Sequence, residues 1–125
     1  QYTYTPGANN EDENGAPLPY GDQCDIYILL ENRDGAKTKR VGTAWFRNGD
    51  TQSSWKEIEV PVKYGQLDPS DDWFDYAQPQ PDEEWGTGTE NVTHISVLFS
   101  SSFEGDFFKG AIGSVLEVDN LILTY

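Results

Sequence analysis

Short apolar runs separated by turn residues dominate the chain and predict an all-β protein. Residues 24–31 are almost continuously apolar, and their β-branched and aromatic side chains favour a buried strand over a helix. In residues 55–64 apolar and polar side chains alternate, which predicts a strand with one buried face, and Pro61 places that strand at a sheet edge or a bulge. We expect further strands at residues 1–5, 40–47, 92–101 and 115–125, and a short turn near residues 70–76.

The last predicted strand changes its alternation partway along. Leu116 and Val118 share one face, but the next apolar residues are Leu121 and Leu123. Keeping all four on one face requires one extra residue, which is a β-bulge. We therefore expect a bulge that changes the direction of the Asp119 side chain.

Composition limits the kinds of partner. The 125 residues fit one domain, expected to span residues 1–125. The formal charge is −14, from 22 acidic and 8 basic residues, which argues against nucleic acid and against anionic lipid. No apolar run is long enough to span a membrane. Four Trp, seven Tyr and six Phe favour a folded domain over a disordered acidic chain. Cys24 is the single cysteine, so an internal disulfide is excluded.

The acidity is concentrated in one region that also carries aromatic residues. No Lys or Arg occurs between Tyr64 and Phe108. A loop as long as residues 65–91 is uncommon in a compact domain unless it is functional or disordered. Sugar rings pack on exposed aromatic planes, and carboxylates beside those planes suit a neutral sugar better than an acidic polysaccharide. The candidate carbohydrate-binding residues are Trp73, Tyr76, Trp85 and Asp72 in the loop, and Trp45 and Trp55 in strands. The alternative is that these aromatic side chains only attach the loop to the core.

Three segments resemble one known family. The stretch from Phe99 to Asp119, with serines at 100–102 and glycines at 105, 110 and 113, resembles the closing signature of the "putative carbohydrate metabolism domain" family. The Tyr-Thr-Tyr-Thr-Pro-Gly start and the Val-Pro-Val block at 60–62 match its pattern too. The resemblance implies a jelly-roll β-sandwich similar to carbohydrate-binding modules, in secreted or surface lipoproteins of Bacteroidetes, beside polysaccharide-utilisation machinery.

One departure from the family concerns extent. The family's Tyr-x-Tyr-x-Pro strand falls near the middle of its domain, whereas here it stands at residues 2–6. The resemblance therefore implies the C-terminal part of a larger, here incomplete, sandwich. Its open edges would be closed within the chain, by a separate N-terminal fragment or by a second copy.

The resemblance also raises a metal and a catalytic hypothesis. Many carbohydrate-binding jelly rolls hold a structural Ca²⁺ through an Asp near the end of the last strand, and Asp119 matches that position. The other ligands in those modules come from first strands that this chain lacks. Glycoside hydrolysis needs two carboxyls roughly 5–9.5 Å apart. The pairs Glu57 with Glu59 and Glu117 with Asp119 would meet that spacing on a strand, as any polar strand face would.

We therefore expect a non-catalytic, carbohydrate-binding-like accessory domain that takes a poly- or oligosaccharide. The expected location is extracellular, cell-surface or periplasmic in a Gram-negative bacterium, without insertion of this domain into the membrane. A purely structural or interaction domain of a surface lipoprotein is the alternative. A glycoside hydrolase is the third hypothesis.

Overall fold

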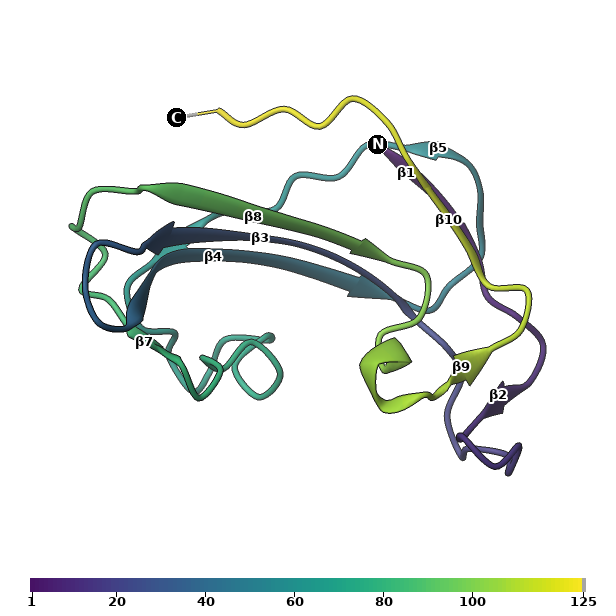
Figure 1. The fold of residues 1–125 in the computed structure, drawn as a ribbon. Helices are drawn as coiled ribbons and strands as arrows, with labels where there is room; N and C mark the ends of the chain where they lie inside the picture. The colour runs from purple at the N-terminus through teal and green to yellow at the C-terminus, as the bar shows by residue number, and fades with distance from the viewer. Residues whose placement is uncertain (125) are drawn as a thin grey trace. The chain divides into compact units, whose positions relative to one another are not determined.

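The computed structural model describes residues 1–124, and that part of the chain is built almost entirely of β-strands (Figure 1). Most strand pairs are antiparallel, and the strands form several sheets, consistent with a β-sandwich. The one helical element described is a single 3-10 turn, η1 (Gly105–Phe107). The prediction of an all-β fold is confirmed.

Two compact units divide the chain. Unit 1 comprises Gln1–Ile26, Arg47–Glu59 and the chain from Phe99 onward. Unit 2 comprises Tyr27–Phe46 and Val60–Leu98. Each unit is assembled from segments that are distant in sequence.

Unit 1 contains two small sheets. One has the order β10 (Val115–Val118), β1 (Tyr2–Thr5) and β5 (Gln52–Lys56), and the other pairs β2 (Asn10–Glu11) with β9 (Gly110–Ala111). Tyr2 and Tyr4 on β1 are fully buried, which explains the alternation at the start of the sequence. Burial raises the pKa of Tyr4 to about 12, and its hydroxyl donates a hydrogen bond of 3.0 Å to the carbonyl of Ser101.

The carboxylate of Asp22 organises the polar interior of unit 1. One of its oxygens accepts hydrogen bonds from the Ser102 hydroxyl (2.6 Å), the Ser114 hydroxyl (2.6 Å) and the Ala111 N–H (3.0 Å). Ser114 in turn accepts the N–H of Gly7 at 2.9 Å. Asp22 is only 2 % exposed, so these donors replace the water that a carboxylate requires. The serines and glycines after Phe99 thus serve the packing of this unit.

A larger sheet supplies most of unit 2. Its order is β6 (Lys63–Tyr64), β4 (Thr38–Asn48), β3 (Cys24–Asn32) and β8 (His94–Ser100), and β7 (Glu83–Trp85) runs parallel to β4. The buried core of this unit contains Leu29, Trp45, Leu67 and Ala77. Leu67 and Ala77 come from the acidic loop, so the loop itself covers the sheet.

Two strand predictions were wrong in extent. The strand expected at 55–64 is interrupted, because β5 ends at Lys56 and β6 begins only at Lys63, with Pro61 in the gap. The last strand ends at Val118 without a bulge, since Asn120 has a left-handed φ of 53° and Leu121 is half-exposed. The final residue of that prediction, Tyr125, lies outside the described residues. The turn near residues 70–76 is confirmed by hydrogen bonds from Phe74 to Asp71 and from Ala77 to Trp73.

Candidate functional site

The acidic loop starts and ends at the same place. Gly65 and Gly88 have left-handed φ values of 77° and 90°, which L residues rarely adopt. Their backbones are in contact, since a Cβ added to Gly88 would lie 2.7 Å from the Gly65 nitrogen. Side chains are thus excluded from both positions, and residues 66–87 form a loop with a closed base.

Two cations of the sheet attach this loop. Lys63 forms an ion pair with Asp71, and its ammonium lies 5.8 Å from the centre of the Trp73 ring. Arg40, which is 2 % exposed, donates to the Glu83 carboxylate at 2.6 Å and to the Ala77 carbonyl at 3.1 Å. Lys63 combines its ion pair with a position beside an indole, and Arg40 combines its ion pair with a hydrogen bond to a core residue. Because of these two attachments, the loop has a fixed conformation.

Three loop aromatics form what we call the aromatic platform, namely Trp73, Tyr76 and Trp85. Trp73 and Trp85 are half-buried and pack against the core of unit 2. The guanidinium of Arg40 lies 5.7 Å from the centre of the Trp85 ring, and because Arg40 is buried, Trp85 covers it. Tyr76 is 37 % exposed. One side of the platform therefore packs against the core of unit 2, and part of its aromatic surface remains exposed.

The two strand tryptophans occupy different environments. Trp45 is buried beneath the platform, stacked on Tyr27 at 3.9 Å and edge-on to Tyr76 at 5.6 Å between ring centres. Its Nε1–H has no hydrogen-bond partner among the described residues. Trp55 lies on β5 in unit 1 and is 50 % exposed. Trp45 thus supports the platform, whereas Trp55 belongs to unit 1.

The carboxylates of the loop fall into two groups. Asp71 and Glu83 are paired with cations, and backbone N–H groups led by that of Thr87 lower the pKa of Glu90 to about 2. The carboxylates of the second group are exposed, and within residues 1–124 none of them makes a side-chain hydrogen bond or ion pair. They are Asp72, Asp75, Asp82 and Glu84. Lys63 and Arg40 are already neutralised, while Lys39 lies opposite Glu84 in the pairing of β4 with β7. The exposed carboxylates of the loop outnumber this one remaining cation.

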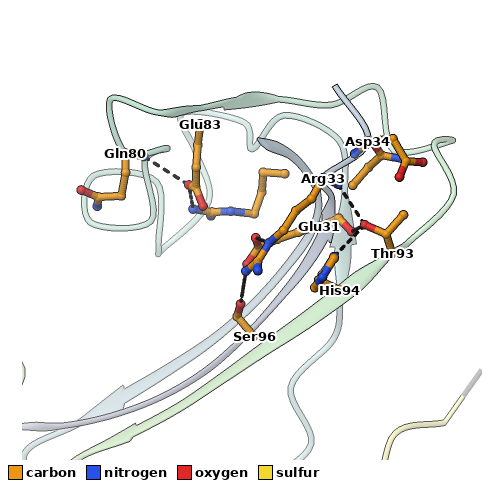
Figure 2. Close-up of polar contacts among 10 residues, drawn as sticks. Glu31, Arg33, Asp34, Gln80, Glu83, Thr93, His94 and Ser96 are labelled. Carbon is orange, nitrogen blue, oxygen red and sulfur yellow. Dashed lines mark hydrogen bonds and ion pairs between the residues drawn. The ribbon is translucent and has the colours of Figure 1, made fainter. Parts of the chain in front are cut away.

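A second polar cluster, which the sequence did not indicate, lies where β3 ends and β8 begins (Figure 2). The buried Glu31 accepts the Ser96 hydroxyl at 2.5 Å and the Arg33 Nε–H at 2.9 Å. Burial alone would raise the pKa of Glu31, but these two hydrogen bonds outweigh it and the pKa is lowered. The Thr93 hydroxyl accepts the N–H of Arg33 and contacts His94. Glu31 on β3 thus joins the two strands through Ser96 on β8.

The residues considered for a metal or for catalysis make few contacts. Asp119 is exposed and its carboxylate accepts the N–H of Asn120. Within residues 1–124 no group of three His, Cys, Asp or Glu side chains is placed to hold a metal ion, and the Ca²⁺ site at Asp119 stays a prediction. Glu57 and Glu59 lie beyond the end of β5, and Glu117 accepts the Thr3 hydroxyl at 2.8 Å. No helix in the described part of the chain is long and apolar enough to cross a membrane.

The described strands define the class as a β-sandwich-type domain. Residues 1–124 match the model of the "putative carbohydrate metabolism domain", and the chain belongs to that family. A solved structure with a similar fold is described as a putative glycoside hydrolase from Bacteroides thetaiotaomicron, with a TM-score of 0.60 and 24 % identity over 92 % of this chain. The chain spans 33 % of that protein's length. No curated protein matches the chain.

Proposed function

We propose that the chain is a non-catalytic carbohydrate-binding domain that takes a neutral glycan on the aromatic platform. The observation that carries this proposal is the platform's construction. Trp73, Tyr76 and Trp85 are partly exposed, yet each is attached to the core, to Lys63 or to Arg40. Rigid aromatic surface binds a sugar ring without the entropy cost of ordering a loop.

The electrostatics of the loop support a neutral ligand. The carboxylates of Asp72, Asp75 and Glu84 are exposed and can accept hydrogen bonds from sugar hydroxyls. They would repel uronic acids and sulfated sugars, since no unpaired Lys or Arg accompanies them in residues 65–91.

Affinity electrophoresis against neutral and acidic polysaccharides tests the proposal. We expect Tyr76→Ser to weaken retention by a neutral polysaccharide at least about fivefold, because stacking of one ring contributes on the order of 1 kcal/mol. Trp73→Phe and Trp85→Phe keep the core filled and should weaken retention less. Trp55→Ala is the matched control, as it removes an exposed indole from the other unit.

The outcomes separate the candidate surfaces. Loss of binding in Trp55→Ala with full binding in Tyr76→Ser would show that the glycan binds at β5 and not on the platform. Equal retention of all variants, each with an unchanged melting temperature, would contradict binding on the platform.

We further propose that the domain works outside the cytoplasm, at the cell surface or in the periplasm, because polymeric glycans are met there. Fractionation of the native host with an antibody to the domain tests this location. Recovery in the cytoplasmic fraction would contradict it.

The alternative role as an interaction domain is favoured by a different observation. Several of the most exposed apolar side chains of unit 1 are concentrated in one short segment that contains Phe107, Phe108 and Ile112. Apolar surface of this kind marks binding surfaces for other proteins.

A further inference from the structure

An open groove of about 560 Å³ lies in unit 1, lined in part by the exposed Phe108 and Ile112. Its walls come from two segments, the loop after β2 and the turn around β9. Figure 1 shows β2 and β9 side by side, with η1 just before β9. The lining residues are Glu11, Asp12, Glu13, Gly15, Phe108, Gly110 and Ile112.

The wall formed by the turn around β9 is apolar and strongly exposed. Phe108 is 77 % exposed and Ile112 is 94 % exposed. Phe108 also has a left-handed φ of 55°, a conformation that is rare for a bulky residue. Side chains this apolar gain free energy when a partner covers them.

The other wall carries unneutralised negative charge. Asp12 uses one oxygen for the N–H groups of Asn14 and Ala16, which shapes the turn and leaves its second oxygen free. Within residues 1–124 neither Glu11 nor Glu13 forms an ion pair. Lys109, next to Phe108 in sequence, lies 3.9 Å from Glu104 instead.

We infer that this groove is a docking site for a protein segment in which arginine alternates with aliphatic residues. A guanidinium forms bidentate pairs with carboxylates and also packs on an aromatic face, and this groove offers both groups together. Aliphatic neighbours of the arginine would cover Ile112. The surface is complementary in charge to such a segment, and the net charge of −14 disfavours a second copy of the same chain. This inference does not rest on the carbohydrate proposal, which concerns unit 2.

Fluorescence anisotropy with two labelled peptides tests the inference. One peptide alternates arginine with leucine, and the other alternates glutamate with leucine. We expect only the arginine peptide to bind, and its addition to shift the amide NMR signals of Gly15 and Gly110. The double variant Glu11→Gln with Glu13→Gln should weaken binding about tenfold. The variant Phe108→Asn should weaken it about fivefold, since Asn tolerates a positive φ but offers no ring.

A charge-matched control distinguishes the groove from general attraction to an acidic protein. The double variant Glu57→Gln with Glu59→Gln changes the net charge equally, and both residues are exposed elsewhere in unit 1. It should bind the arginine peptide as the parent chain does. Equal weakening by both double variants would overturn the inference, as would equal binding of the glutamate peptide. Binding of a neutral oligosaccharide that is lost in Phe108→Asn, without binding of the arginine peptide, would make the groove a sugar site and would also overturn it.

Discussion

One oxygen of Asp22 receives three donors that lie 80, 89 and 92 residues away in sequence. A buried carboxylate can only accept hydrogen bonds, so each donor must be placed by the chain around it. Ser102, Ala111 and Ser114 belong to the stretch that resembles the family signature, and the structure gives that stretch a role in packing. A substitution at Asp22 therefore acts on three segments at once.

Asp22→Asn should destabilise the protein by about 3 kcal/mol. One carboxylate oxygen accepts the three donors above and the other accepts the N–H of Gln23, so the new amide N–H₂ group must face a donor on one side. Urea unfolding followed by tryptophan fluorescence measures this loss. Asp106→Asn is the control, since Asp106 is an exposed carboxylate in the same stretch, and it should change stability by less than about 0.5 kcal/mol. Equal effects of the two substitutions would contradict the role assigned to Asp22.

Phe108→Asn should raise stability by about 1 kcal/mol in the absence of a partner. A bulky residue at a φ of 55° is strained, whereas Asn adopts this conformation readily. The exposed ring contributes little packing that could be lost. Differential scanning calorimetry should show a higher melting temperature, and a lower one would show that the ring has a stabilising contact.

At the scale of elements, alternation and apolar runs located β1, β3 and β4 because burial of one or both faces leaves a direct record in sequence. The same pattern located β8, although Ile95, Val97 and Phe99 are exposed in the structure. The extent of β5 and β10 was harder to predict, since an interrupted strand keeps the same residue pattern when its backbone leaves the sheet. The loop's aromatics were identified from composition, but their attachment by Lys63 and Arg40 depends on residues that are distant in sequence. No local pattern reports such contacts.

Gly88→Ala should destabilise the protein by about 2 kcal/mol, because it adds a Cβ 2.7 Å from a backbone nitrogen at a φ of 90°. It should also weaken glycan retention, since the base of the loop must open. Gly35→Ala is the control, as its nearest added contact is an ordinary 3.7 Å. Thermal unfolding and affinity electrophoresis of both variants test this prediction. Unchanged stability and retention in Gly88→Ala would show that the backbone at the base of the loop can shift to accommodate a Cβ.

At the scale of the whole molecule, repulsion among the negative charges opposes folding. A few carboxylates offset part of this repulsion, because their charged forms are stabilised in the folded state. Glu31, Asp68 and Glu90 have pKa values below their ordinary ones. Each binds a proton less readily in the folded state than in the unfolded state. Their contribution to stability is thus complete above pH about 4.5 and declines as the pH falls toward the folded values.

Glu90→Gln should therefore reduce stability at pH 7, and the difference from the parent chain should vanish as the pH falls toward about 2. Unfolding by urea across that range measures the difference. A difference that stays constant with pH would mean that Glu90 acts through its shape and not through its charge. Glu84→Gln removes the same charge from an exposed carboxylate in residues 65–91 and is the matched control.

The contact between Gly65 and Gly88 has a consequence for how such a domain can diversify. A segment that enters and leaves a scaffold at one point can be exchanged or lengthened without altering the path of the strands on either side. The two glycines would act as a fixed insertion point for interchangeable recognition loops. A grafted loop of different aromatic and charge content would then change ligand choice while β3, β4 and β8 stay as they are.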